Sequence, residues 1–321
     1  MKRCCVIGGS GFIGSFVVKA LLAEGRKVLV IGRNKRPTRP LPLNVEYISG
    51  DFGDKYFLRG VLRNVDEIID LAYASVPKTS YYNPIQDIFD NLPPILTLLD
   101  AASQASICKV VIVSSGGVIY GHTDTLLIDE THPTNPISPY GITKLAIEKY
   151  AHMFQATRDL PVVCVRPGNA YGETQKPFVG QGFIATAIAA ILAGQEITLF
   201  GESGTIRDYI HVSDVAAGIV AALEFGLPGE IYNIGSGVGM NNRDILDAIQ
   251  PLALVDGLKV RVNTLPLRKF DVRSNILDSS KLRNNSGWSD TITFEEGIKR
   301  TWTWFKDGLL PYPQAQDRVG L

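Results

Sequence analysis

The sequence predicts an α/β protein with a doubly wound parallel sheet, followed by a smaller α+β domain. Short apolar runs alternate with segments of helical period through the first half of the chain, a pattern typical of repeated strand–helix–strand units. A glycine-rich turn, Gly8 to Gly14, directly joins the first apolar run to the first helical segment. A chain of 321 residues is long enough to bury one large core or two adjoining ones.

The elements of the first half follow one another in a regular order. Apolar runs that read as buried parallel strands occupy residues 3–7, 27–31, 45–48, 66–71, 108–113 and 161–165. Helical spacing of apolar residues marks 12–24, 54–63, 86–105 and 140–157. Right-handed crossovers between such strands place helices on both faces of one sheet, which is the Rossmann arrangement.

The regular alternation of strands and helices ends after residue 166. Glycine and proline loops, shorter strands and helices near 181–193, 213–225, 241–250 and 294–306 follow. We therefore expect a dinucleotide-binding Rossmann domain over residues 1–166 and a mainly substrate-binding domain over 167–321. Elements near 212–235 are expected to return to the first sheet.

Composition excludes several classes of partner. Lysine plus arginine equals aspartate plus glutamate, 32 each, so no net field attracts nucleic acid or an anionic membrane. No apolar run approaches the roughly 20 residues of a membrane span, and the N-terminus lacks a signal-peptide pattern. Cys4, Cys5, Cys108 and Cys164 lie in or beside expected buried strands, with spacings that suit neither a zinc site nor a disulfide framework. These features indicate a cytoplasmic protein with reduced thiols and no metal.

The glycine turn has the context of a dinucleotide site. Gly8, Gly11 and Gly14 allow a tight turn, close approach of a pyrophosphate and close packing of helix on strand. The helix that starts with Phe12 and Ile13 then offers free N–H groups to the phosphates. The alternative is a glycine-rich turn that serves packing alone.

The second expected strand ends at Gly32-Arg33, where an NAD site normally has an acid for the adenosine ribose. Arg33 is able to grip a 2′-phosphate, as in NADP sites, or it forms a solvated face with Lys35 and Arg36. The cofactor is thus NAD or NADP. Further cofactor contacts are expected from residues after the third and fourth strands: Asp51 and Phe52 beside the adenine, and Leu71 and Ala72 beneath the pyrophosphate.

Tyr140 and Lys144 carry the expected chemistry. Four residues apart, they share one face of a helix, where the ammonium is able to lower the pKa of the phenol towards neutrality. A strand that ends in Ser114 and Ser115 precedes them. Behind a dinucleotide turn, this set is typical of a nicotinamide redox site.

In these motifs the chain resembles the extended short-chain dehydrogenase/reductase family, and within it the nucleotide-sugar epimerases and dehydratases. UDP-glucose/UDP-N-acetylglucosamine 4-epimerases look most similar. The resemblance covers nearly the whole chain, through GGSGFIG, SSGGVIYG, SPYGITK, VRPGNAYG, RDYIHVSDVA, YNIGSG and the late GW. It implies a homodimer through helices 86–105 and 140–157, tightly held NAD or NADP, and a UDP-linked sugar as substrate.

The resemblance also implies roles for single residues. Tyr140 is the acid/base, Lys144 holds the nicotinamide ribose, and Asn91 contacts the cofactor. Asn169, Arg207, Arg268 and Asp271 bind the nucleotide diphosphate and its ribose. Two guanidinium forks on separate loops suit a diphosphate, although each arginine is equally suited to a structural ion pair. Asn275, where plain-hexose epimerases often have tyrosine, leaves room for an N-acetyl group.

One catalytic position departs from the family pattern. The epimerases usually have serine or threonine four residues before the tyrosine of the V-Y-G string, and this chain has Gly116 there. Ser115 is the nearest hydroxyl and is expected to bond the sugar oxygen, with Ser114 behind it towards the cofactor. The alternative is that both serines satisfy backbone groups at a strand end.

The same segment separates the candidate reactions. Sugar 4,6-dehydratases need an extra acid and base after this position, and the chain has Gly116-Gly117-Val118. Dehydration is therefore disfavoured, and we expect an NAD(P)-dependent 4-epimerase that works through a transient 4-keto sugar. The alternatives are an NADPH-dependent 4-keto-sugar reductase and a non-catalytic NAD(P)-binding regulator.

Overall fold

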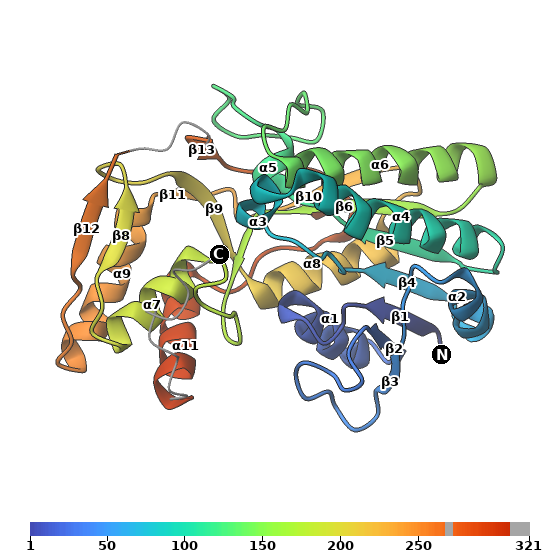
Figure 1. Ribbon diagram of the computed structural model, residues 1–321, viewed down its shortest axis with the longest axis horizontal. Coiled ribbons are helices and arrows are strands. Elements are labelled where there is room, and N and C mark those ends of the chain that lie inside the picture. Colours follow the sequence, from blue (N-terminus) through green and yellow to red (C-terminus); the bar gives the residue numbers. More distant parts are fainter. Residues whose placement is uncertain (267–271, 309–321) are drawn as a thin grey trace.

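The computed structural model describes residues 1–266 and 272–308, and its main feature is a seven-stranded parallel sheet. The strands lie in the order β10-β6-β5-β4-β1-β2-β3 (Figure 1). Their bounds are β1 Arg3–Ile7, β2 Lys27–Gly32, β3 Glu46–Ser49, β4 Glu67–Asp70, β5 Lys109–Val113, β6 Val162–Pro167 and β10 Ile231–Ile234. The expected doubly wound sheet is confirmed, and its last strand comes from the second half of the chain.

Successive side chains of each strand point to opposite faces of this sheet, and so contribute to two apolar cores. Cys4 and Val6 of β1 belong to the core under α1 (Phe12–Ala23) and α8 (Val212–Phe225). Cys5 and Ile7 belong to the core on the opposite face. That second core lies under α2 (Lys55–Val61), α4 (Pro84–Ser103) and α6 (Pro139–Arg158). Because both faces are covered, the strands are apolar throughout rather than alternating with polar residues.

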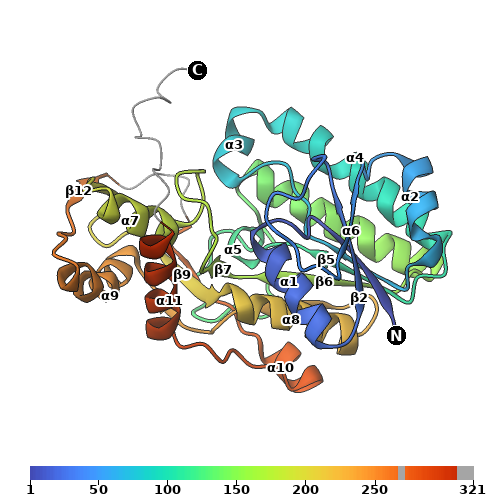
Figure 2. The ribbon, with the colours of Figure 1, turned by 90° about the horizontal axis from the view of Figure 1, so that it is seen from below.

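The second half builds a smaller body beside this sheet (Figure 2). Its core is formed by the helices α7 (Phe183–Leu192), α9 (Asn242–Val255) and α11 (Phe294–Asp307) with the strands β8 and β9. The remaining strands there are short. They are β7 Asn169–Tyr171, β8 Ile197–Phe200, β9 Ile206–His211, β11 Gly239–Met240, β12 Val262–Leu265 and β13 Ser274–Asn275. α10 (Ser280–Ser286) instead packs against α8 and β10, and its Leu282 belongs to the core under α1 and α8.

Two kinds of element differ from the expectation. α9 continues through Pro251 to Val255, whereas a helix near residues 241–250 was expected. α4 runs through Pro93 and Pro94, in agreement with the helix expected over residues 86–105. Packing of the apolar faces outweighs the loss of single intrahelical hydrogen bonds at these prolines. Short elements were missed because periodicity needs more than one or two turns. These are α3 Pro77–Tyr82, α5 Gly116–Ile119 and the 3₁₀ turn η1 Leu62–Asn64.

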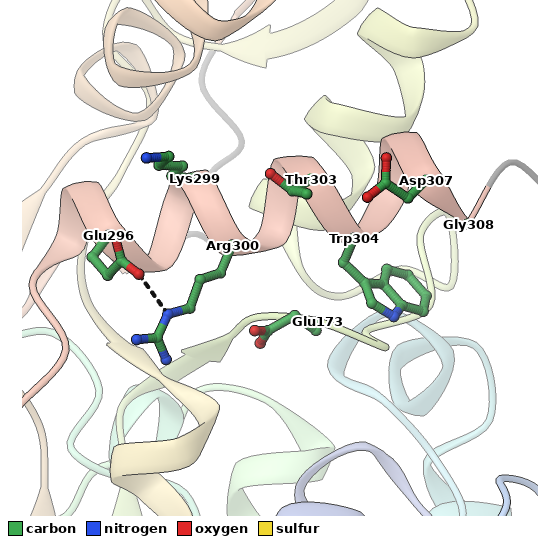
Figure 3. A pocket seen from close by; sticks show the side chains of 8 residues that line it. All are labelled: Glu173, Glu296, Lys299, Arg300, Thr303, Trp304, Asp307 and Gly308. Atoms are coloured by element: carbon green, nitrogen blue, oxygen red, sulfur yellow. Dashed lines mark hydrogen bonds and ion pairs between the residues drawn. The ribbon is translucent and has the colours of Figure 1, made fainter.

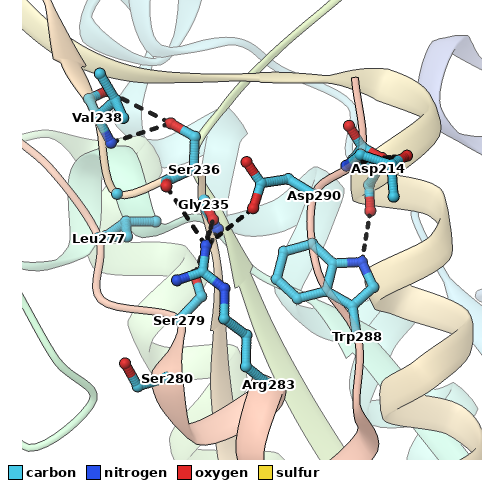
Figure 4. A network of polar contacts seen from close by, with 12 residues as sticks. Asp214, Gly235, Ser236, Val238, Leu277, Ser279, Ser280, Arg283, Trp288 and Asp290 are labelled. Atoms are coloured by element: carbon cyan, nitrogen blue, oxygen red, sulfur yellow. Dashed lines mark hydrogen bonds and ion pairs between the residues drawn. The ribbon is translucent and has the colours of Figure 1, made fainter. Parts of the chain in front are cut away.

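A polar network joins the smaller body to α8 and β10 (Figure 4). The Trp288 indole N–H donates to the carbonyl oxygen of Asp214 at 3.2 Å, and the Asp214 carboxylate accepts the N–H groups of Thr291 and Ile292, both at 3.1 Å. Arg283 pairs with Asp290 at 3.0 Å. The late tryptophan of the family resemblance is thus a structural anchor. In the described residues, we find no helix with the length and apolarity that crossing a bilayer requires.

Candidate active site

The expected site residues gather at the carboxyl ends of the parallel strands. Gly8 follows β1, Leu71 follows β4, Ser114 follows β5 and Asn169 opens β7 just after β6. The strand order reverses between β1 and β4, and ligands of open α/β sheets bind in the crevice outside such a reversal.

The glycine turn has the geometry of a dinucleotide cradle. Gly8 has a φ of +78°, and a Cβ there would lie 3.2 Å from the backbone of Leu71 and Ala72. A Cβ on Gly14 would lie 2.3 Å from the carbonyl oxygen of Gly8. Gly11 is the N-cap of α1 and provides no side-chain cap, and the first turn of α1 contains no acid. The N–H groups of that first turn are therefore able to bind an anion. These residues fit a bound pyrophosphate, with Phe12 and Ile13 half-buried at the start of the helix.

At the end of β2, Gly32 replaces the acid that NAD sites normally have, and packing explains this replacement. A Cβ on Gly32 would lie 2.5 Å from the hydroxyl oxygen of Tyr47, which donates to the carbonyl oxygen of Asn34. Tyr47 therefore fills the space that an acidic side chain would need. Arg33 and Asp51 are exposed nearby, and Phe52 packs against the second core.

Lys144 lies buried among groups that fix its ammonium. Its Nζ donates to the carbonyl oxygen of Val113 at 2.8 Å and lies 5.9 Å from the centre of the Tyr140 ring. Burial lowers the pKa of Lys144 to about 8, although the carboxylates of Asp70 and Glu148 oppose this shift. The pair predicted from the sequence is thus assembled at the end of β5.

The pKa of the Tyr140 phenol is raised, whereas the Tyr140–Lys144 spacing predicts that it is lowered towards neutrality. Burial and the charge of Asp87 raise the pKa of the Tyr140 phenol above its usual value, and the hydrogen bond to Ser115 only partly offsets this. A lysine 5.9 Å away that also donates to a carbonyl does not outweigh desolvation.

Position 116 has no room for a side chain. A Cβ on Gly116 would lie 2.5 Å from the Leu277 side chain and 2.9 Å from the carbonyl oxygen of Arg166. The carbonyl oxygen of Gly116 also accepts the Asn275 amide at 3.1 Å. Packing thus explains why the family hydroxyl is absent at 116, and Ser115 provides the hydrogen bond to Tyr140 instead.

Replacing Gly116 with alanine lowers the free energy of unfolding by about 1–3 kcal/mol, the usual cost of overpacking a filled site. Urea unfolding of the variant measures this. Gly60→Ala is the matched control, because a Cβ there meets nothing within 4 Å and it lies inside α2. That control should gain about 0.5–1 kcal/mol. Equal stabilisation by both alanines would show that Gly116 is not crowded.

Two further cofactor candidates differ in how their side chains are used. The Ser114 hydroxyl is buried and has no hydrogen-bond partner among the residues that the structure describes, as suits a group that awaits a ligand. Asn91 accepts the N–H of Ala74 and donates to the carbonyl oxygen of Asp87, both at 2.7 Å. Asn91 thus fixes the loop after β4.

The expected nucleotide-binding residues lie close to the segment Ser114–Gly117, which leads from β5 into α5 and which we call the catalytic turn. A Cβ on Gly117 would lie 3.1 Å from the Asn169 side-chain oxygen. Asn275 of β13 pairs in register with Arg207 of β9, and the buried Asn275 amide reaches Gly116. The structure therefore brings Asn169, Arg207 and Asn275 towards one turn. Arg268 and Asp271 lie outside the described residues.

Comparison with known proteins agrees with this geometry. Residues 4–235 match the NAD dependent epimerase/dehydratase family. The chain belongs to that family. It is 33% identical to the UDP-glucose 4-epimerase of Mycolicibacterium smegmatis over 313 residues, which cover 95% of this chain and 99% of that enzyme.

Solved structures of family members superpose on nearly the whole chain. The Thermus thermophilus UDP-glucose 4-epimerase in complex with NAD is 34% identical with a TM-score of 0.88, over 96% of this chain and 100% of that one. The Thermotoga maritima UDP-glucose 4-epimerase with UDP-glucose is 31% identical with a TM-score of 0.89, over the same shares. The chain is thus an NAD-dependent sugar-nucleotide epimerase of the extended short-chain dehydrogenase/reductase type.

One contact that holds the glycine turn of this chain in place was not predicted from the sequence. Arg39 donates to the carbonyl oxygen of Ser10 at 3.3 Å and to that of Thr174 at 2.7 Å. Thr38 adds a hydrogen bond to the carbonyl oxygen of Ser10 at 2.6 Å. Thr174 has a φ of +70°, which is unfavourable for a β-branched residue. Arg39 therefore ties the glycine turn to the loop after β7.

Replacing Arg39 with methionine is expected to speed NAD release about 10- to 100-fold, since hydrogen bonds from a charged donor contribute about 1.5–3 kcal/mol. The nucleotide content of the purified protein and its loss during dialysis measure this. Arg36→Met, an exposed arginine of the same loop, is the control. If both variants lose cofactor equally, general positive charge rather than the Arg39 contact retains it.

The described residues of the smaller body line two surface hollows, and neither is lined by Tyr140 or Lys144. The larger, about 640 Å³, runs along α11, where Glu173 lies beneath Arg300 and Trp304 (Figure 3). The other, about 370 Å³, is lined by residues of β7, β9 and the segment before α11. His211 lines it and faces Glu173, with 3.0 Å between the His211 Nε2 and Glu173 Oε2 atoms. These hollows are distinct from the catalytic turn.

Proposed function

We propose that this protein interconverts UDP-hexoses at C4 with retained NAD. The observation that carries the proposal is the catalytic turn itself. Tyr140 and Lys144 stand at the end of β5, while α5 opens with Gly116, Gly117 and Val118 and offers no second acid or base. A family that contains both epimerases and dehydratases divides on this point, because loss of water requires that extra pair.

Each catalytic side chain has a separate task in this proposal. NAD supplies a reversible hydride acceptor, and its positively charged ring favours the ionised form of a nearby phenol. Tyr140 takes the proton of the C4 hydroxyl and later returns it. Ser115 holds the same oxygen by a hydrogen bond, and Lys144 provides positive charge next to the phenol.

The cofactor and substrate ends are assigned to different parts of the chain. Residues 1–166 hold NAD through the glycine cradle, Ser114 and the loop that Asn91 fixes, with Arg33, Asp51 and Phe52 towards the adenosine. Residues 167–321 hold the nucleotide sugar through Asn169, Arg207, Arg268 and Asp271. Asn275, smaller than tyrosine, supports UDP-N-acetylhexosamines as a second substrate class.

The same proposal includes a cytoplasmic homodimer through α4 and α6. These helices pack against each other, and each exposes apolar side chains. Among those at least 37% exposed are Ile85, Ile88 and Phe89 on α4, and Ile142, Tyr150 and Met153 on α6. Such an exposed apolar surface is typical of an interface between copies. Light scattering should give twice the monomer mass, and a Phe89→Glu variant should give the monomer mass.

The test of function is to incubate the purified protein with UDP-glucose or UDP-N-acetylglucosamine, without added cofactor, and to resolve C4 epimers by NMR. Epimer formation without net change in nicotinamide supports the proposal, and the preferred sugar tests the role of Asn275. Turnover only of a 4-keto sugar with stoichiometric NADPH would instead identify a reductase. No change in either sugar with NAD or NADP supplied would refute the UDP-hexose assignment.

A further inference from the structure

A buried carboxylate lies behind the catalytic pair. Asp87, in the first turn of α4, is only 3% exposed. It accepts hydrogen bonds from the hydroxyls of Thr143 at 2.7 Å, of Tyr73 at 3.3 Å and of Ser75. Thr143 immediately precedes Lys144 on α6. A buried acid with three hydroxyl donors is a costly arrangement, and packing alone does not require it.

The Tyr73 ring connects this carboxylate to the catalytic pair. Its centre lies 4.2 Å from the Nζ of Lys144, within the range of a cation–π contact. It also meets the Tyr140 ring edge-to-face, with 4.7 Å between the ring centres. The Tyr73 hydroxyl points the other way, towards Asp87 and the carbonyl oxygen of Tyr140 at 3.5 Å. One aromatic ring thus touches both catalytic side chains while its hydroxyl is anchored on Asp87.

We propose that Asp87 is a positioning residue for the reaction, which acts through Tyr73 and Thr143 to hold Tyr140 and Lys144 and to set the pH at which they work. This rests on the proposed function of the Tyr140–Lys144 pair. Asp87 touches neither side chain of the pair by a hydrogen bond, so its influence reaches them through the Tyr73 ring, through the α6 turn that carries Thr143, and through its charge.

Among the described residues, the other titratable groups near the pair come from separate elements. Asp70 ends β4, and burial raises its pKa to about 7 while Lys144 opposes that shift. Glu148 lies one turn after Lys144, but it is engaged by Arg166 through both carboxylate oxygens, at 3.0 and 2.6 Å. Cys164 of β6 is a buried thiol whose pKa is raised by burial. Asp87 differs from these groups because it raises the pKa of both catalytic side chains, Tyr140 and Lys144.

The sign of the effect follows from the charge. The Asp87 carboxylate disfavours a phenolate on Tyr140 and favours an ammonium on Lys144. Removing that charge lowers the pKa of both groups. The proposed reaction needs ionised Tyr140 and protonated Lys144. Its kcat therefore has a rising and a falling limb as the pH increases, and the pKa values of these two groups set the two limbs. An Asp87→Asn variant should therefore shift both limbs of the kcat profile towards lower pH, by about 1 unit, the lower end of what one nearby charge produces.

The experiment compares Asp87→Asn with Asp87→Glu and with Asp90→Asn, an exposed acid on the same helix. The pH profile of kcat is measured for each. The ionisation of Tyr140 is followed separately by tyrosinate absorbance, as the difference between each variant and its Tyr140→Phe counterpart. The acid-shifted profile is expected for Asp87→Asn alone, with Asp87→Glu close to wild type because the charge is kept. The absorbance titration needs no turnover, so it tests Asp87 even if UDP-hexoses prove to be the wrong substrates.

Two outcomes would overturn the proposal. One is an Asp87→Asn protein with a lowered Tm, an unmoved pH profile and an unmoved Tyr140 titration, which would leave Asp87 a purely structural group. The other concerns Tyr73, and it remains available if Asp87→Asn does not fold. Tyr73→Phe keeps the ring against Lys144 but loses the hydroxyl to Asp87, and kcat should fall several-fold with little change in profile. Wild-type kcat in Tyr73→Phe would show that the anchored ring does not position the pair.

Discussion

Replacing Tyr140 with phenylalanine is expected to lower kcat for C4 epimerisation by about 10²- to 10⁴-fold, the usual contribution of a positioned general acid or base. The ring contact with Tyr73 survives in the variant, so the site keeps its shape, but no group remains to take the proton of the sugar hydroxyl. NAD content and Tm should stay close to wild type, because the Tyr140 hydroxyl does not hold the glycine cradle. Steady-state kinetics, nucleotide content and thermal unfolding check these three quantities.

The matched control is Tyr232→Phe, a buried tyrosine of β10 whose hydroxyl accepts the N–H of Leu227 at 3.0 Å. Its kcat should remain within a few-fold of wild type. A Tyr140→Phe protein that keeps full epimerase activity would remove Tyr140 from the chemistry. Unchanged cellular function in a Tyr140→Phe strain would favour a non-catalytic, cofactor-binding regulator.

Replacing Arg166 with methionine is expected to lower the free energy of unfolding by about 3–5 kcal/mol, because it leaves the carboxylate of Glu148 buried without its partner. Arg166 and Glu148 are 2% and 3% exposed and are joined by two hydrogen bonds, and Arg166 also donates to the hydroxyl of Tyr120 at 2.9 Å. Urea unfolding monitored by tryptophan fluorescence measures the loss.

The double variant Arg166→Met/Glu148→Leu separates the pair from its surroundings. Removal of both charges should recover part of the stability lost in Arg166→Met, since no unpaired charge is then buried. Arg158→Met is the control, because its pairing with Asp100 is on the surface and contributes about 0–1 kcal/mol. If the double variant were as unstable as the sum of its single variants, the two charges would not be coupled.

Much of the fold could be predicted because it is encoded locally. Alternation in β1 sends Cys4 and Val6 to one core and Cys5 and Ile7 to the other, which explains why the run reads as continuously apolar. The glycine turn and the Tyr140–Lys144 spacing were likewise readable, since each depends on neighbours in sequence. Short helices and strands near residues 274–286 were not, because they depend on contacts with β9 and α8.

The parts of the site that were not predicted join distant segments. Arg39 meets Thr174 across 135 residues, and Tyr73 reaches Asp87 from another element. The sign of the Tyr140 pKa shift also depends on burial, and burial follows from tertiary packing rather than from spacing. The sequence shows that Gly116 stands where the family usually has a catalytic serine or threonine. The reason for the glycine follows only from the tertiary structure, in which Leu277 and the carbonyl oxygen of Arg166 leave no room for a side chain.

The central claim is oxidation and re-reduction at one carbon, and the most direct test is to follow deuterium placed at C4 of the glucosyl ring of UDP-glucose. The account predicts a UDP-galactose product that keeps the deuterium at C4, with none released to water and no added cofactor required. Deuterium at C6 of a dehydrated product, or loss of the label to solvent, would contradict it.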